Sequence, residues 1–114
     1  MDDLEQVARE YVAAFNEAVG ARDFGGFLTR FADDAVMRFE NVPGAGVLEY
    51  VGRPAYAAAY AQQPPDDQLE IDGAVRQEAA ILVIPFVWRR DGAPGEIRLT
   101  IRNGLITRMV AAFG

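Results

Sequence analysis

This chain of 114 residues contains no cysteine, no histidine and no lysine. Without cysteine there is no disulfide framework, thiol nucleophile or cysteine metal site, and the composition suits a reducing compartment. Without histidine, Ser-His-Asp and Cys-His catalysis and ordinary zinc sites are excluded. Acid–base chemistry would fall to Asp, Glu, Tyr or Arg. We therefore expect no metal and no cofactor.

Positive charge is also scarce. The net charge is −6, and the one adjacent basic pair is Arg89-Arg90, next to a predicted turn. Nucleic-acid binding needs a basic footprint, so we expect no nucleic-acid partner. No stretch is long and apolar enough to span a bilayer, and residues 1–20 are acidic and amphipathic, unlike a signal peptide. We expect no membrane partner and a cytoplasmic location.

Hydrophobic residues make up 51% of the chain, enough to bury a core in one domain over residues 1–114. Residues 3–19 show helical periodicity, and Asp2 followed by Glu5 resembles a capping box. A second, short helix is predicted from Asp23 to about Arg30. Its glycines weaken it, by about 1 kcal/mol each relative to alanine. The apolar stripe of the first helix consists of Leu4, Val7, Ala8, Tyr11, Ala14, Phe15 and Ala18.

An acidic corner, Asp33-Asp34, follows the second helix. Beyond it the pattern predicts a strand, a short strand and a third helix that begins at Pro54, a residue favoured in the first helical turn. The second half of the chain reads as strands, and Asn103-Gly104 is a strong hairpin signal. Pro85 predicts a sheet edge or a bulge. The predicted ranges are 35–40, 47–51, 54–62, 69–77, 80–90, 96–102 and 105–113.

Alternation along these strands separates two faces. The inward rows would be Met37 and Phe39, then Leu82 to Trp88, then Ile97, Leu99 and Ile101, then Met109 to Phe113. The opposite face of one strand carries Ile81, Val83, Pro85 and Val87. Helices first and a strand meander afterwards predict the α+β class, with the helices on one face of a curved sheet.

This order resembles the nuclear transport factor two-like superfamily, whose members include SnoaL-like polyketide cyclases and ketosteroid isomerases. Three segments carry the resemblance: Phe31-Ala-Asp-Asp-Ala35, Gly52-Arg-Pro-Ala-Tyr56 and Asn103-Gly-Leu-Ile-Thr-Arg-Met109. The resemblance implies a cone-shaped, mostly antiparallel sheet packed against three N-terminal helices. It also implies one pocket inside the cone and often a homodimer built through the outer sheet face. The apolar row from Ile81 to Val87 independently favours such a dimer.

The catalytic positions of ketosteroid isomerases look replaced here. By the resemblance, Phe39 stands where their Asp base lies, and Phe15 stands where their oxyanion-donating Tyr lies. The place of their partner acid offers only Ile97, Leu99 and Ile101. Scytalone dehydratase relies on His, which is absent, and no Asp-Arg-Asp relay of the limonene epoxide hydrolase type can be assembled. Whether the chain is an enzyme stays open.

The charged candidates favour structural roles. Asp33 and Asp34 would cap backbone donors rather than form a catalytic pair. Glu40 should point outward unless a bulge turns it inward, and Arg38 should form a surface ion pair. The hydroxyls of Tyr11, Tyr50, Tyr56 and Tyr60 are the best polar groups for a pocket. We predict these ligand-binding residues: Tyr11, Phe15, Met37, Phe39, Tyr56, Tyr60, Phe86, Trp88, Leu99 and Met109.

Three functions remain open at this point. The first is binding of a small apolar or amphipathic molecule in the cone. The second is an isomerase, cyclase or dehydratase-type enzyme acting on a small hydrophobic substrate. The third is a homodimeric protein-interaction module with a filled cone. An open cavity would favour the first two, and an ionisable group with a strongly shifted pKa inside it would favour the second.

Overall fold

The longer helices carry one apolar stripe and the strands carry one apolar face, as the sequence predicts. A computed structural model describes residues 3–113 and confirms the α+β class. None of its helices is both long and apolar enough to cross a bilayer. The elements are α1 (Asp3–Ala21), α2 (Gly25–Leu28), β1 (Phe31–Val42), β2 (Gly46–Val51), α3 (Arg53–Gln62), β3 (Leu69–Ile71), β4 (Arg76–Glu78), β5 (Ile81–Trp88), β6 (Pro94–Arg102) and β7 (Leu105–Phe113).

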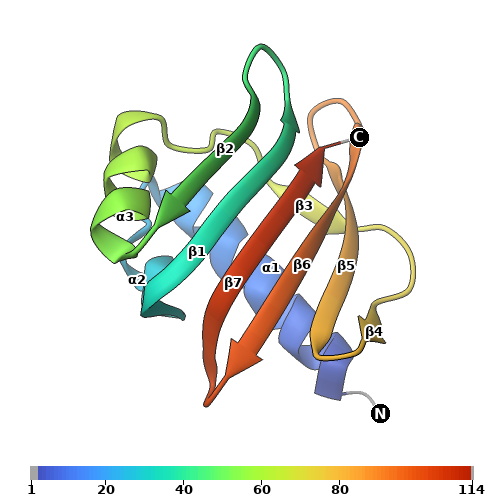
Figure 1. Ribbon diagram of the computed structural model, residues 1–114. Helices are drawn as coiled ribbons and strands as arrows, with labels where there is room; N and C mark the ends of the chain where they lie inside the picture. The colour runs from blue at the N-terminus through green and yellow to red at the C-terminus, as the bar shows by residue number, and fades with distance from the viewer. Residues whose placement is uncertain (1–2, 114) are drawn as a thin grey trace.

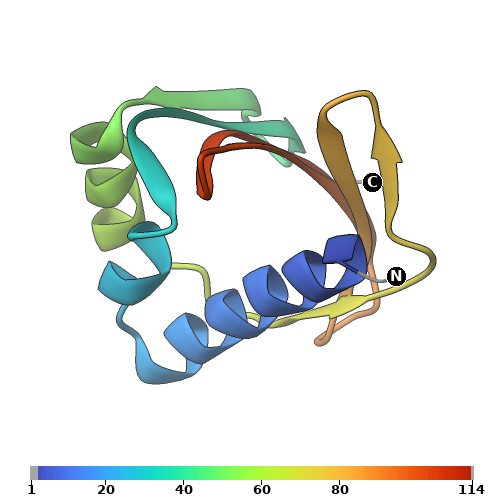
Figure 2. The ribbon, with the colours of Figure 1, turned by 90° about the horizontal axis from the view of Figure 1, so that it is seen from below.

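The strands form one mixed sheet in the order β2-β1-β7-β6-β5-β3, with β4 also paired to β5 (Figure 1). Every pairing is antiparallel except β1 with β7, which run parallel. The sheet curls strongly, and α1 lies across its open side while α2 and α3 stand at one end (Figure 2). The concave face of the sheet and the three helices therefore enclose one interior.

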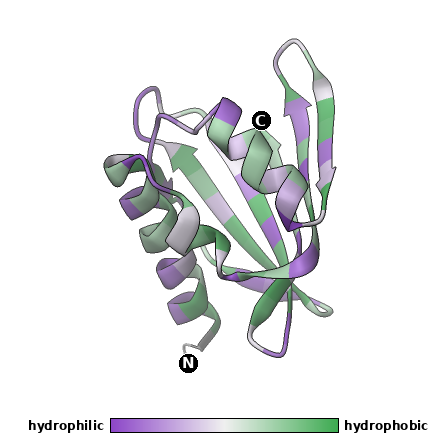
Figure 3. Ribbon diagram, turned by 90° about the vertical axis from the view of Figure 1, so that its left-hand side faces the viewer, coloured by the Kyte–Doolittle hydropathy of each residue, from purple (hydrophilic) through white to green (hydrophobic). Residues whose placement is uncertain are grey.

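Alternating side chains fill that interior. Met37, Ile84, Leu99 and Met109 point inward from four strands and are almost completely buried. Figure 3 shows the alternation as hydrophobic and hydrophilic bands along the strands. Aromatic rings join the helices to one another: the Phe27 ring lies within 6.4 Å, centroid to centroid, of those of Tyr11, Phe15, Phe24, Phe31 and Tyr60.

Pro85 lies where the outer partner of β5 is interrupted. The predicted strand over 69–77 is in fact two strands of three residues, β3 and β4, on the same side of β5. The Pro85 carbonyl accepts a hydrogen bond from the Asp72 N–H on that side (2.9 Å), and a donor from residue 85 would point the same way. Because proline has no N–H, the ladder breaks there, and the chain bulges through Gly73 at φ 115°.

The second helix is shorter than predicted. It covers four residues, and the Asp23 carboxylate accepts a hydrogen bond from Gly25 N–H (3.0 Å) just before it. The two glycines explain the short length, since each disfavours a helix. β1 in turn begins at Phe31 and runs through the acidic corner, with an irregular ladder to β7 between Phe31 and Val36. The predicted capping box at Asp2 lies outside the described residues.

Ion pairs cover part of the outer face, the side of the sheet away from α1. Arg76 and Arg98 flank Val83 in register, and both bind the Glu78 carboxylate, at 2.8 and 3.1 Å. Val83 is fully buried within the single chain, and the other members of its row, Ile81, Pro85 and Val87, are half-buried. Arg76 and Arg98 therefore flank the one member of this apolar row that is fully buried, and the other members stay partly exposed.

The prediction for Ile101 was wrong in one respect. It continues the inner row of β6 but is 39% exposed. The ladder to β7 shifts register between Thr100 and Ile101, and only the first turns of α1 reach this end of the sheet. Leu4 and Val7 of α1 are exposed beside it. A shallow second hollow results, lined by Leu4, Val7, Gln77, Ala80, Leu82, Leu99 and Ile101.

Candidate ligand cavity

The interior of the cone is not completely filled. A cavity of about 240 Å³ lies between the concave sheet face, α1 and the C-terminal half of α3. None of the described residues that line it carries a charge. They are Tyr11, Phe15, Phe39, Val42, Leu48, Tyr50, Ala59, Tyr60, Gln63, Pro65, Leu69, Phe86, Trp88, Ile97, Met109, Ala111 and Phe113.

One end of the cavity is built from aromatic rings on four strands. Phe113 stacks on Phe39 with ring centroids 6.3 Å apart, and its other neighbour is Trp88 at 6.0 Å. Trp88 in turn meets Phe86 edge to face at 5.5 Å, and Phe39 meets Tyr50 in the same way at 6.3 Å. These contacts hold flat apolar surfaces around the cavity.

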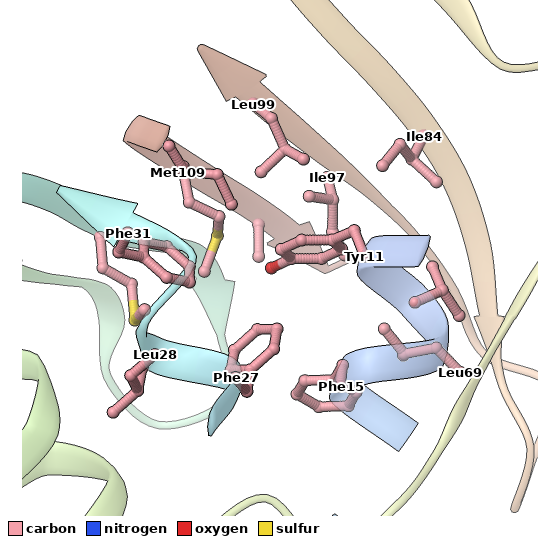
Figure 4. Packing of buried hydrophobic residues seen from close by; sticks show 14 of the residues in the cluster. Tyr11, Phe15, Phe27, Leu28, Phe31, Leu69, Ile84, Ile97, Leu99 and Met109 are labelled. Carbon is pink, nitrogen blue, oxygen red and sulfur yellow. The ribbon is translucent and has the colours of Figure 1, made fainter. Parts of the chain in front are cut away.

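Two tyrosines supply polar atoms to this apolar wall. Tyr11 of α1 is 4% exposed and Tyr60 of α3 is 7% exposed. In Figure 4 the Tyr11 hydroxyl points away from α1 toward Met109 of β7. Among the described residues neither hydroxyl has a hydrogen-bond partner. In these residues the one side-chain nitrogen or oxygen that is both fully enclosed and without a partner is Arg53 Nε, so neither hydroxyl is fully enclosed. Both hydroxyls therefore border open space, which the cavity provides.

Burial also fixes the protonation of these tyrosines. It raises the pKa of the Tyr11 hydroxyl well above its ordinary value, and the nearby Tyr60 hydroxyl raises it further. Burial likewise raises the pKa of Tyr60. Both phenols are neutral at physiological pH and act as hydrogen-bond donors or weak acceptors, because the ionised form would be desolvated.

Seven of the ten predicted ligand-binding residues line the cavity: Tyr11, Phe15, Phe39, Tyr60, Phe86, Trp88 and Met109. The other three do not line it: Met37 and Tyr56 are fully buried in the core, and Leu99, also buried, lines the second hollow. The Tyr56 hydroxyl donates to the Ala32 carbonyl (2.9 Å), which turns this side chain toward the start of β1. Met37 precedes Phe39 by one inward position, and Leu99 lies nearer the second hollow, so neither reaches the aromatic end.

The predicted list of ligand-binding residues omits part of the wall, including Tyr50, which the sequence had offered only as a polar group for a pocket. Leu48 and Tyr50 come from β2, and Gln63 and Pro65 come from the end of α3 and the loop after it. Leu48 and Tyr50 are paired with Phe39 and Met37 in the β1–β2 ladder, so the alternation of β2 was a usable signal. Gln63 and Pro65 gave no such signal, because nothing local to a loop shows which way it packs.

The charged candidates lie outside the cavity. Asp33 pairs with Arg53 at 3.0 Å and is almost fully exposed, so it forms no catalytic carboxylate pair with Asp34. Arg38 binds Glu40 and Glu49, at 2.7 and 3.0 Å, on the outer face. Glu40 thus points outward, as the alternation predicts. Within residues 3–113 no group of three acidic side chains is arranged to hold a metal ion.

No protein-family model and no curated protein matches the chain. Solved structures do match it. A nuclear transport factor two-like protein of unknown function from Burkholderia xenovorans LB400 aligns over 96% of this chain and 84% of its own, with 22% identity and a TM-score of 0.68. The chain has the nuclear transport factor two-like fold.

Two further structures of this fold bear on activity. A candidate isomerase of the SnoaL-like family from Agrobacterium tumefaciens strain C58 aligns over 100% of this chain and 99% of its own, with 19% identity and a TM-score of 0.72. A candidate ketosteroid isomerase from Kribbella flavida aligns over 93% and 76%, with 18% identity and a TM-score of 0.61. The nuclear transport factor two-like fold thus includes isomerase candidates and proteins of unknown function, and it fixes no activity by itself.

Proposed function

We propose that this protein binds a small, neutral, mostly apolar molecule in the cone, with a hydrogen-bond acceptor directed at Tyr11 and Tyr60. The observation that carries the proposal is the combination of an open apolar cavity with two buried phenols that have no partner among the described residues. Each hydroxyl borders the cavity, so an acceptor on a ligand there would gain a hydrogen bond in largely apolar surroundings.

The volume sets the size of the ligand. Drug-sized sites occupy roughly 300–1,000 Å³, and this cavity, at about 240 Å³, is smaller. An apolar cavity of about 150 Å³ in another protein accommodates benzene. Scaling by volume, we therefore expect a ligand of about 10 heavy atoms, such as a small bicyclic ketone, lactone or ether.

The wall sets the charge of the ligand. An ionised carboxylate or amine would enter a site whose described lining has no opposite charge, and would lose its hydration there. The polar hydrogens of the wall come from phenols, the Trp88 indole and the Gln63 amide. Such donors suit an acceptor on a neutral ligand.

The two alternatives fit the cavity less well. General acid–base catalysis needs a base facing the substrate, and the described wall contains no carboxylate. Phe39 lines the cavity at the position that the resemblance assigns to the base of ketosteroid isomerases. A phenol whose pKa is raised by burial is a poor base near neutral pH. An interaction module with a filled cone is disfavoured by the open volume.

The test uses Trp88, the only tryptophan, which is half-buried in the cavity wall. Fluorescence and thermal shift would be measured with three probes of similar shape: 1-tetralone, tetralin and tetralin-2-carboxylate. We expect the ketone to bind more tightly than the hydrocarbon, and the carboxylate to bind least. Binding to the folded state alone must also raise the melting temperature. No response to any probe, or a preference for the carboxylate, would contradict the proposal.

Tyr60→Phe and Tyr11→Phe provide the matched variants. Each removes one hydroxyl and keeps the ring that forms the wall. We expect each to reduce ketone affinity toward that of tetralin, and to leave tetralin affinity unchanged. An equal loss for both probes would show that the ring, and not the hydroxyl, holds the ligand.

A further inference from the structure

Gly95 of β6 lies directly beneath the ring of Phe86. The two residues are cross-strand partners, and Phe113 of β7 is the partner of Gly95 on the other side. A Cβ atom on residue 95 would overlap Cζ of the Phe86 ring and lie 2.8 Å from its Cε2. It would also lie 2.9 Å from the Ala112 carbonyl oxygen. The Phe86 ring therefore occupies the space that a side chain at position 95 would need.

Glycine weakens the interior of a strand, so its presence there calls for a reason such as a close approach. The backbone torsion of Gly95 does not supply one, since it is not among the residues with positive φ. The close approach of the Phe86 ring supplies the reason for a glycine at this position. Phe86 and Phe113 both face the cavity, so the missing side chain of Gly95 belongs to the same concave face.

The other surroundings of Phe86 leave its ring few places to go. The ring is 1% exposed, meets Trp88 edge to face, and has Ile71 of β3 as its partner on the side away from β6. The cavity is the open space that the ring borders. A side chain at position 95 would therefore turn the ring into the cavity, because well-packed neighbours on the other sides resist displacement.

We infer that Gly95 sets the depth of the cavity, and with it the size of the largest ligand that the site admits. It does so because its missing side chain leaves room for the Phe86 ring to lie against β6. Gly95 does not line the cavity and acts through Phe86, so it is a positioning residue. The inference about ligand size rests on the proposed function, whereas the inference about the ring does not.

Three variants test it: Gly95→Ala, Phe86→Leu and the double variant. The probes are cyclohexanone and 1-tetralone, which carry the same acceptor on one ring and two. In Gly95→Ala we expect 1-tetralone to bind at least about tenfold more weakly, as for lost room in a hydrophobic pocket, while cyclohexanone affinity stays near that of the unmodified protein. In the double variant we expect tetralone affinity to return, because the smaller leucine leaves room for the added methyl group.

A crystal structure of Gly95→Ala gives a readout that needs no ligand. A Phe86 ring turned inward, with a smaller cavity, supports the inference whether or not the ketones bind. If the unmodified protein binds neither ketone, that result counts against the proposed function alone. A ring still lying over residue 95 with an unchanged cavity would overturn it. If Gly95→Ala fails to fold, the double variant decides. A double variant that folds and binds 1-tetralone as Phe86→Leu does supports the inference. A double variant that also fails to fold overturns it, because the Ala112 carbonyl and not the Phe86 ring is then the obstacle.

Discussion

The side-chain amide of Asn16 makes two hydrogen bonds to the backbone of a single residue, Leu69. Asn16 Nδ2 donates to the Leu69 carbonyl at 2.9 Å, and Asn16 Oδ1 accepts from the Leu69 N–H at 2.8 Å. This pairing fastens β3 to α1, and Gln68 adds a hydrogen bond from its side chain to the Asn16 carbonyl at 2.9 Å. Because Leu69 lines the cavity, the same amide also holds one side of the cavity wall.

Asn16→Ala is expected to lower the free energy of unfolding. The substitution leaves the N–H and C=O groups of Leu69, whose side chain is almost fully buried, without their partners. A loss of about 1–3 kcal/mol is typical when a buried backbone group loses its partner. Urea denaturation followed by circular dichroism measures the effect. Gln6→Ala on the exposed face of the same helix is the control, since its amide bonds only Glu10. Equal effects of the two substitutions would argue against the role given to Asn16.

Tyr56→Phe and Tyr60→Phe are expected to differ in stability. The Tyr56 hydroxyl donates to the Ala32 carbonyl, whereas Tyr60 has no partner among the described residues. Removing the first should cost about 1 kcal/mol, the usual net contribution of such a bond. Removing the second should have little effect, because the Tyr60 hydroxyl bonds none of the described residues. Thermal unfolding without ligand compares the two directly, and a larger loss in Tyr60→Phe would contradict the placement of its hydroxyl.

The stability of the protein is expected to fall in alkaline solution. Burial raises the pKa of Tyr11, Tyr56 and Tyr60 in the folded state. The folded state therefore retains protons that the unfolded state releases near pH 10, the ordinary value for tyrosine. This contribution to stability is complete below about pH 10 and declines as the pH rises through the folded values. Urea midpoints between pH 8 and pH 11.5 measure it. Tyr60→Phe should show a shallower decline, and an identical slope would count against the burial.

A homodimer through the outer face stays a prediction. The apolar row from Ile81 to Val87 is its basis, although Val83 is already covered by its own ion-pair network. Light scattering on a sizing column at tens of micromolar would give twice the 12.5 kDa of the chain if the prediction holds. A dimer held partly by these charges should weaken in high salt. A mass of one chain under all conditions would contradict it.

Local patterns predicted the elements but not their interruptions. The alternation from Leu82 to Trp88 placed β5 and its faces, and Asn103-Gly104 marked the last turn, where both residues have positive φ. Pro85 predicted an irregularity in the sheet, but the resulting break lies between β3 and β4, which pair with β5 and do not contain Pro85. A sequence pattern shows which residue lacks a backbone N–H donor. It does not show which neighbouring strand loses a hydrogen bond as a result.

The site was less accessible to sequence reasoning than the fold. Tyr56 and Tyr60 are four residues apart on one helix face and look equivalent in the sequence, yet one bonds a backbone carbonyl and the other borders the cavity. The difference depends on where β1 begins relative to α3. Likewise, Gly95 carries no side chain to attract attention, and its contact with Phe86 exists only because two strands pair in one register.

The parallel pairing of β1 with β7 has a consequence for folding kinetics. Before β7 joins, the sheet consists of two fragments, β2-β1 and β6-β5-β3, with no ladder between them. β1 and β7 are far apart in the chain, so closing the loop between them costs entropy before any contact repays it. We expect this step to lie on the folding barrier, and substitutions within β7 to slow folding more than they speed unfolding. Until that strand is in place, no strand pairing joins the two halves of the cavity wall.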